Sequence, residues 1–269
     1  MRRSLTVLTL AMCLAFAGAT VAMAASLIGT PGDDTLTATA AGDELYGEAG
    51  NDTLTAFAGG AYIEGGPGSD RIFGAGGADL IIAGTGDDRI DGGAGDDNVY
   101  AGPGADEAIG GAGSDTLLGQ NGDDRLFGGP GRDTLRVGAG TNFADGGSGR
   151  DSITANGGHS TITGGSSSDT IVATSGVFIV RGGSGKDRIR TGDGNDNVSG
   201  GPDADGVATG GGDDTIDARD NVRDRIYCGS GNDTVYADQI DILRGCEKVV
   251  LDVPPFKRGL GRGVKPSAP

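Results

Sequence analysis

The stretch GGPGSDRI at residues 65–72 decides the fold, because its pattern returns every nine residues along most of the chain. Between Leu36 and Ile216, 19 of the 21 positions spaced nine apart hold Leu, Ile or Val, without insertion or deletion. The residue two places before this aliphatic position is Asp in 17 copies, and the residue four places before it is Gly in 18. A fixed period of this kind indicates a repeat protein rather than a flexible glycine linker.

Each repeat, written G-G-x-G-x-D-x-U-x with U the aliphatic residue, predicts one short strand and one turn. In the segment x-U-x the central side chain points inward and its neighbours point outward, as the two-residue period of a strand requires. The glycines supply the positive φ angles that tight turns demand. The sequence therefore predicts an all-β fold over residues 25–217, a parallel β-roll solenoid in which two repeats, about 18 residues, form each coil.

The composition supports a repeated small unit and narrows the range of partners. The 269 residues include 56 Gly and no Trp, which disfavours a core of large side chains, and the absence of a strict glycine triplet excludes collagen. The formal net charge of −17 disfavours nucleic acid and anionic lipid as partners and favours divalent cations.

The turn carboxylates are the candidate metal ligands. Each coil buries few apolar side chains, so its turns need further support, and calcium takes six to eight hard oxygen ligands of the kind that a glycine-rich turn exposes. Stacking places the Asp of one coil over the Asp two repeats later. On the first edge the expected ligands are Asp34, Asp52, Asp70, Asp88, Asp106, Asp124, Asp196 and Asp214. On the second edge they are Asp43, Asp79, Asp97, Asp115, Asp133, Asp151, Asp169, Asp187 and Asp205.

The two edges are interrupted differently. The first edge loses its Asp at Asn142, Ser160 and Phe178, whereas the second is broken only at Ala61. If every neighbouring pair holds one ion, the ceiling is roughly a dozen calcium ions, and the second edge should be the better filled. The segment 137–181 is read either as continuous roll with a first edge that binds no ion or as a bulged insertion.

The repeat resembles the RTX (hemolysin-type) calcium-binding nonapeptide repeat. Good copies lie at residues 65–72, 92–99 and 128–135, and the resemblance covers roughly residues 29–217. It implies a calcium-binding β-roll. Many proteins with such repeats leave the cell through an exporter that reads a C-terminal signal, whereas this chain has an N-terminal leader and a basic tail.

Residues 1–24 are typical of a secretory signal peptide. Arg2 and Arg3 precede an apolar stretch at residues 5–21, and Ala22-Met23-Ala24 suits cleavage near Ala24. A lipid attachment at Cys13 is the weaker alternative, and the apolar run is short for a membrane span. The expected location is secreted or extracellular, including the cell surface.

The C-terminal part is expected to close the solenoid. Cys228 and Cys246 are an even pair two repeat lengths apart in an exported chain, which favours a disulfide between neighbouring rungs. Residues 218–252 are interpreted as an atypical terminal repeat and cap, and residues 253–269 as a disordered basic tail.

No catalytic motif stands out. The one histidine, His159, is expected in a loop, and neither an H-E-x-x-H nor a G-x-S-x-G motif occurs. The sequence predicts a nonenzymatic calcium-binding protein with a structural or adhesive use; the alternative is a module of, or an accessory to, a polysaccharide-modifying or other extracellular enzyme. Outward apolar residues such as Tyr100 and Phe127 are either ordinary exposed side chains or a surface for a glycan, a protein or a second copy.

Overall fold

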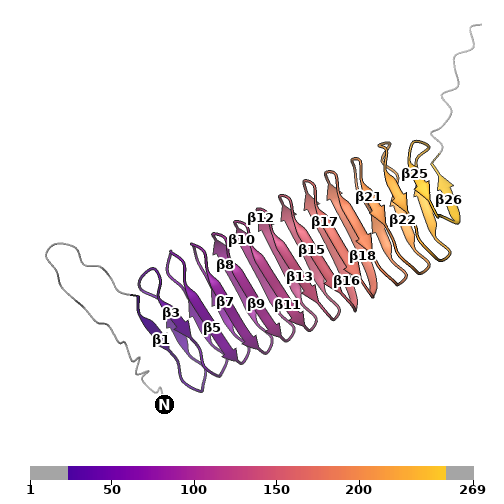
Figure 1. Cartoon of the computed structure of the whole chain (residues 1–269). Helices are drawn as coiled ribbons and strands as arrows, with labels where there is room; N and C mark the ends of the chain where they lie inside the picture. The colour runs from indigo at the N-terminus through magenta and orange to yellow at the C-terminus, as the bar shows by residue number, and fades with distance from the viewer. Residues whose placement is uncertain (1–23, 253–269) are drawn as a thin grey trace, which may run out of the picture.

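The computed structural model describes residues 24–252 as a long roll of two parallel sheets with thirteen strands each (Figure 1). The odd-numbered sheet contains β1 (Ser26–Ile28), β3 (Glu44–Tyr46), β5 (Tyr62–Pro67), β7 (Leu80–Thr85), β9 (Asn98–Pro103), β11 (Thr116–Asn121), β13 (Thr134–Gly138), β15 (Ser152–Asn156), β17 (Thr170–Thr174), β19 (Arg188–Thr191), β21 (Gly206–Ala208), β23 (Arg225–Tyr227) and β25 (Ile242–Arg244). The even-numbered sheet contains β2 (Thr35–Thr37), β4 (Thr53–Thr55), β6 (Arg71–Phe73), β8 (Arg89–Ala94), β10 (Glu107–Ala112), β12 (Arg125–Pro130), β14 (Phe143–Ser148), β16 (His159–Ser166), β18 (Val177–Ser184), β20 (Asn197–Ser199), β22 (Thr215–Ala218), β24 (Thr234–Ala237) and β26 (Lys248–Leu251). The predicted all-β solenoid is therefore confirmed.

The register follows the coil of two repeats. Leu45 pairs with Ile63 and Ile63 with Ile81, and all strand pairs within each sheet are parallel. First-edge turns lead into even-numbered strands and second-edge turns into odd-numbered strands. Each strand therefore stacks on the equivalent strand of the next coil, and each coil contacts mainly its two neighbours.

The core consists of two stacked rows of the periodic aliphatic side chains, one row from each sheet. Most of them, from Leu45 to Val235, are fully buried, and the two positions where the pattern weakens, Ala108 and Ala144, are also 0% exposed. The neighbouring strand residues point outward, as the buried centre of the pattern in β2 and β6 shows. The inward position of the repeat was correctly predicted from the nine-residue period.

Several strands are longer than the expected three residues. β5 has six residues and β16 has eight, because the turn backbone also pairs with the turn of the next coil, as Gly66 does with Gly84. Both sheets also continue through residues 137–181, so this segment is continuous roll and not a bulged insertion. One small irregularity falls between Arg136 and Gly138 in β13.

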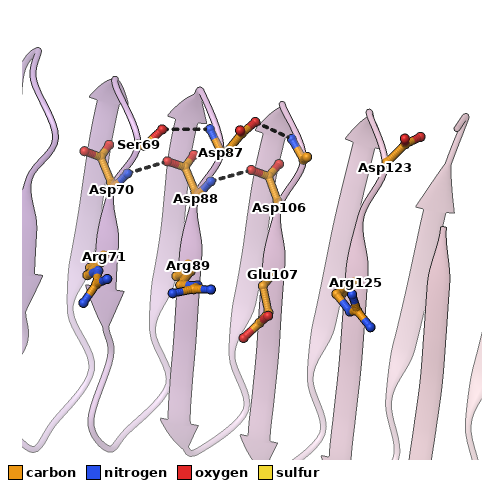
Figure 2. A pocket seen from close by; sticks show the side chains of 11 residues that line it. Ser69, Asp70, Arg71, Asp87, Asp88, Arg89, Asp106, Glu107, Asp123 and Arg125 are labelled. Atoms are coloured by element: carbon orange, nitrogen blue, oxygen red, sulfur yellow. Dashed lines mark hydrogen bonds between the residues drawn. The ribbon is translucent and has the colours of Figure 1, made fainter. Parts of the chain in front are cut away.

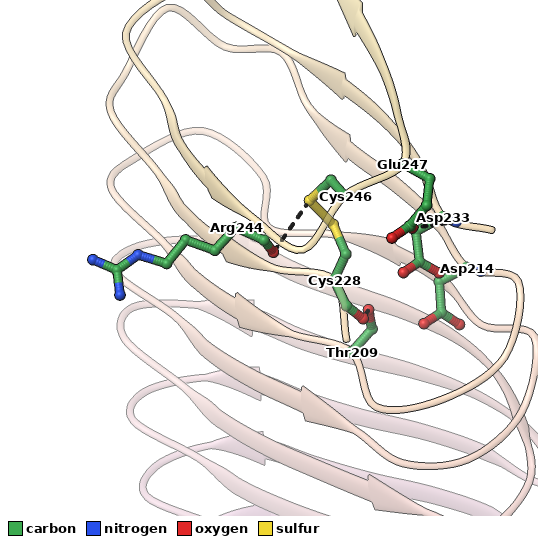
Figure 3. The surroundings of a disulfide bond; sticks show 7 residues. All are labelled: Thr209, Asp214, Cys228, Asp233, Arg244, Cys246 and Glu247. Atoms are coloured by element: carbon green, nitrogen blue, oxygen red, sulfur yellow. Dashed lines mark hydrogen bonds between the residues drawn. A yellow bond between two sulfur atoms is a disulfide. The ribbon is translucent and has the colours of Figure 1, made fainter. Parts of the chain in front are cut away.

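The C-terminal end departs from the regular spacing. Val207 pairs with Ile226, which lengthens the coil by one residue, and Ile226 pairs with Leu243, which shortens the next coil by one. Strands β25 and β26 extend the two sheets by one more short coil, and β26 is exposed along its length. The disulfide Cys228–Cys246, with an S–S distance of 1.99 Å, joins this coil to the preceding one (Figure 3).

Two expectations fall outside the described residues. These are the signal peptide, of which only Ala24 is described, and the basic tail at residues 253–269. Within residues 24–252, we find no helix with the length and apolar character needed to cross a membrane.

Candidate metal-binding turns

The turn aspartates form a hydrogen-bonded ladder along each edge. The Oδ1 atom of Asp52 accepts a hydrogen bond from the backbone N–H of Asp34 at 2.7 Å, and Oδ1 of Asp97 accepts one from Asp79 at 2.8 Å. The same bond recurs between coils along both rows of aspartates. Each carboxylate thus accepts a hydrogen bond from the coil before it in the sequence.

A second ladder runs in the opposite direction on the outside of the turns. In many turns, a polar residue before the Asp position accepts a hydrogen bond from the coil after it, as Asn51 Oδ1 does from Ser69 N–H at 2.8 Å. Figure 2 shows the next two steps, in which Asp87 N–H donates to Ser69 Oγ and Asp87 Oδ1 accepts from Ala105 N–H. Together, the two ladders link the backbone N–H groups of stacked turns to side chains of both neighbouring coils.

The other carboxylate oxygen of most turn aspartates is buried without a hydrogen-bond donor. Among the described residues, the Oδ2 atoms in this condition belong to Asp52, Asp70, Asp79, Asp88, Asp97, Asp106, Asp115, Asp124, Asp133, Asp151, Asp169, Asp187, Asp196, Asp205, Asp214 and Asp233. A buried acceptor without a partner is costly, and more so when it carries charge. A row of such atoms indicates that a cation belongs in each turn.

The first glycine of the repeat gives that cation an oxygen-lined space. A Cβ at Gly128 would lie 2.6 Å from Asp133 Oδ2 and 2.6 Å from the carbonyl oxygen of Gly146 in the next coil. The backbone of Gly128 does not require positive φ, so the absent methyl group matters for space rather than for conformation. Two acceptors therefore face one small space with no donor between them, and carboxylate and carbonyl oxygens are ligands that calcium prefers.

This space is more regular on the second edge than on the first. On the second edge, the position is glycine in eight consecutive coils, namely Gly74, Gly92, Gly110, Gly128, Gly146, Gly164, Gly182 and Gly200. On the first edge, the equivalent position is glycine at residues 29, 47, 65 and 119, but the buried side chains of Ala83, Ala101 and Val137 occupy it in other coils. The structure thus gives the second edge the more uniform set of oxygen-lined spaces.

In the first two turns, the Oδ2 atoms of the aspartates accept hydrogen bonds from the protein. Asp34 Oδ2 accepts hydrogen bonds from the backbone and side chain of Thr30, and Asp43 Oδ2 accepts from the backbone N–H groups of Thr39 and Ala40. Although burial opposes it, these donors and Ala25 N–H lower the pKa of Asp43. The structure places these two expected ligands in the rows but supplies their Oδ2 atoms with donors from the protein itself.

Burial perturbs the remaining turn carboxylates in the opposite direction. Desolvation raises the pKa of Asp70 to about 6 and the pKa values of Asp88 and Asp133 to about 7, although a backbone N–H group opposes each shift. Neighbouring aspartates add to the effect, since Asp151 and Asp115 both raise the pKa of Asp133. The ionised rows therefore lack compensating positive charge.

The interrupted part of the first edge uses other means to close its turns. Asn142 Oδ1 still accepts a hydrogen bond from Asp124 N–H at 2.7 Å, but its Nδ2 has no partner among the described residues. Phe178 takes the place of an aspartate one coil after Ser160, and its ring is 0% exposed. An apolar ring thus fills the interior of a turn that carries no carboxylate.

Two buried aspartates of the rows were missed by sequence reasoning. Asp224 and Asp233 continue the second and first edges respectively, because their Oδ1 atoms accept from Asp205 N–H and Asp214 N–H, 19 residues earlier. The signal was present in the repeat at residues 224–235, but the extra residue of that coil broke the strict count. Reading the rows across a single insertion would have found both.

The terminal coil ends the aspartate ladder with substitute acceptors. Asp233 N–H donates to Glu247 and Asp224 N–H to Asp241, at sequence separations of 14 and 17. Figure 3 shows Asp214, Asp233 and Glu247 following one another beside the disulfide. The C-terminal segment therefore closes hydrogen bonds that a further repeat would otherwise close.

No cluster of three or more His, Cys, Asp or Glu side chains that could hold a metal is found within residues 24–252. Each row instead offers isolated carboxylates one coil apart, flanked by backbone carbonyls. Such a set would suit a cation that accepts main-chain oxygens, whereas zinc prefers His and Cys.

These features define a class of protein, the parallel β-roll whose glycine-rich turns are built around calcium. A model of the RTX calcium-binding nonapeptide repeat, four copies long, matches most of the chain, and the protein belongs to this family. The matches cover residues 28–60, 55–86, 74–108, 100–135, 109–144, 145–177, 181–217 and 223–239. No curated protein matches the chain. The family match and the buried aspartates together identify calcium as the ion of these turns.

Proposed function

We propose that this chain is a secreted, nonenzymatic structural protein whose folding is coupled to calcium. The observation that carries this proposal is the row of buried Oδ2 atoms, each without a donor, as at Asp133, where Oδ2 faces the same small space as the carbonyl oxygen of Gly146. This arrangement suits the binding of ions that stabilise the turns.

Coupling follows from the charge of the turns. Without a cation, stacked carboxylates repel one another at short range, and the burial that raises their pKa values destabilises their ionised form. An ion that binds the folded roll and not the unfolded chain adds its binding free energy to folding. We therefore expect the ionised apo chain to be weakly folded at neutral pH.

The aspartates predicted from the sequence, together with Asp224 and Asp233, would supply the ligands. Oδ2 atoms and the carbonyls of the first repeat position are the groups that would hold calcium. Bound ions would neutralise the turns and hold adjacent coils together. We propose that the second edge fills first and that roughly a dozen ions is the upper limit.

An exported, structural or adhesive role agrees with the other features. The disulfide Cys228–Cys246 suits an oxidising compartment. The chain would stay unfolded at low calcium and fold at extracellular calcium concentrations.

His159, the single histidine, is exposed at the start of β16, not in a loop as expected, and its carbonyl oxygen accepts a hydrogen bond from the N–H group of Asn142.

The test is a calcium titration of the purified chain, followed by far-UV circular dichroism and hydrodynamic radius in the same samples. We expect compaction and a gain of β signal between micromolar and millimolar calcium, with reversal by a chelator. Magnesium is the matched control, because it keeps its water ligands more firmly and demands a stricter octahedral geometry. A chain that is equally compact in chelator and in calcium would contradict the proposal.

A further inference from the structure

A groove of about 390 Å³ lies on the odd-numbered sheet beside the second edge. Three successive strands line it with Arg188 from β19, Gly206 from β21 and Arg225 from β23, which are direct neighbours in the sheet. Lys186 and Arg150 lie at its turn side. Four cationic side chains thus gather on one part of a strongly acidic chain.

Gly206 is unusual because neither backbone conformation nor packing requires it. Its φ is not in the left-handed region, and a Cβ built there would find only the carbonyl oxygen of Asp187, at 3.9 Å. A glycine inside a strand costs stability and often marks the close approach of a ligand. Here it leaves a hollow between two guanidinium groups.

The cations of this groove are free to bind. Among the described residues, the one ion pair within 4 Å joins Arg219 to Asp217, so Arg188 and Arg225 pair with no described carboxylate. Both arginines are exposed. The carboxylates that line the groove, Asp169, Asp187 and Asp205, are buried turn residues that calcium would neutralise.

The first edge carries a groove of similar design with a more acidic lining, because Asp87 and Asp123 line its turn side, whereas Lys186 and Arg150 line that of the other groove. This groove, on the even-numbered sheet, holds Arg89 from β8, Glu107 from β10 and Arg125 from β12 (Figure 2). Glu107 takes the place that Gly206 takes on the other sheet. In that groove, a carboxylate of the protein occupies the position between the two arginines.

We propose that the groove of Arg188, Gly206 and Arg225 binds the carboxylate or sulfate groups of an acidic polysaccharide. This proposal rests on the proposed function, because calcium must fold the roll and neutralise the buried aspartates. Arg188 and Arg225 stand two strand spacings apart, about 10 Å, which suits a chain with regularly spaced anions. Arginine recognises carboxylate and sulfate oxygens with several N–H donors at once.

The lining favours a saccharide over other polyanions. Ser168 and Thr170 provide hydroxyl groups, and no aromatic residue lines the groove for stacking nucleic acid bases. No large apolar side chain lines it either, so nothing there would enter a lipid layer.

The experiment measures binding of a sulfated heparin-derived oligosaccharide and of an oligouronate to the calcium-loaded chain by calorimetry, with neutral dextran as the control ligand. We expect Gly206→Glu to weaken binding at least tenfold, because it places a carboxylate where Glu107 lies in the other groove. Glu107→Gly is the matched variant, and it should add only a weaker second site, because Asp87 and Asp123 also line that groove. Circular dichroism in calcium, recorded on the same samples, separates loss of this site from failure of calcium-coupled folding.

Arg225→Gln provides a second route if Gly206→Glu alters the calcium response. Loss of oligosaccharide binding in Arg225→Gln with an unchanged calcium titration would support the proposal. Unchanged binding in a folded Gly206→Glu or Arg225→Gln variant would overturn it. Absence of binding to both acidic probes, or equal affinity for single-stranded DNA, would also overturn it.

Discussion

The two edges of the roll share one scaffold and close their turns differently. On the second edge, aspartates and first-position glycines repeat without interruption from Asp79 to Asp205. On the first edge, three consecutive turns carry Asn142, Ser160 and Phe178 instead, and the sheets still continue past them. The stacked aliphatic side chains therefore set the register, and the carboxylates are the groups that we expect to determine which turns bind a cation.

The same comparison shows two ways to stabilise a buried turn. In a turn with an aspartate, one carboxylate oxygen accepts a backbone N–H group of the preceding coil. The other oxygen is left for an ion. The turn of Phe178 has no such oxygen, and its N–H donates to Asp196 Oδ1 at 2.8 Å while the ring fills the interior. We expect the first kind of turn to depend on calcium concentration, and the second to depend mainly on apolar packing and on its hydrogen bond to Asp196.

The largest expected effect is the pH dependence of the calcium-free chain, because it involves aspartates of nearly every coil. Burial raises the pKa values of Asp79, Asp133 and Asp169 from 3.8 to about 7, so the folded state binds protons more tightly than the unfolded state. Their contribution to stability is thus fully present below about pH 4 and is lost as the pH rises to about 7. In chelator, circular dichroism should show more folded chain at pH 4.5 than at pH 7.5.

Calcium should reverse this trend, because protons compete with the ion for the same oxygens. The calcium-loaded chain should therefore lose stability as the pH falls. A chelated chain that unfolds on acidification from pH 7.5 to 4.5 would show that the buried carboxylates do not limit the apo fold.

The next effect compares one carboxylate with the amide that replaces it on the other edge. Asp133→Ala and Asn142→Ala each remove an acceptor for a backbone N–H group of the preceding coil, at a cost of about 1–3 kcal/mol. Asp133→Ala should also weaken two ion sites, each worth about 2.7 kcal/mol at calcium one hundred times the Kd. Urea unfolding with and without calcium measures the difference. If both variants lose the same free energy of unfolding in calcium, the turn of Asp133 does not bind an ion.

Phe178 allows the turn without a carboxylate to be tested by itself. Phe178→Ala should lower the free energy of unfolding by about 3–5 kcal/mol, because it empties a fully buried site. The loss should be similar in calcium and in chelator supplemented by acid. Phe73→Ala, at a side chain that is 42% exposed, is the control and should change stability by less than about 0.5 kcal/mol. A strongly calcium-dependent loss in Phe178→Ala would mean that this turn does hold an ion.

The smallest effect exchanges the residues of the oxygen-lined space between edges. Gly128→Ala should displace Asp133 Oδ2 and weaken calcium binding roughly tenfold, about 1.4 kcal/mol. Ala101→Gly on the first edge should strengthen it, while loss of a buried methyl group costs about 0.8 kcal/mol in the apo chain. Calcium titrations of both variants would show opposite shifts. If calcium affinity shifted in the same direction in both variants, the glycines would matter for backbone conformation rather than for the space at the ion.

The period of the sequence predicted the scaffold well because it reflects packing inside the coil. The inward aliphatic side chains, the pairing of strands two repeats apart and the disulfide between rungs all follow from counting residues. The count failed at Asp224 and Asp233, since an extra residue between β22 and β23 changed the spacing to 19 without disturbing the strands. The direction of the ladders could not be predicted, because it depends on the conformation of the turn backbone rather than on which residues repeat.

The direction of the aspartate ladder gives the rod two unlike ends. Because each carboxylate serves the coil before it, a rod cut between coils would present unsatisfied N–H groups on the last coil of one fragment. The first coil of the other fragment would present carboxylates that have lost their donors. Such ends match head to tail and mismatch head to head, as do the ends of a polar filament. In this chain, Asp241 and Glu247 accept the last N–H groups of the two rows, so the ladder ends within the terminal coil.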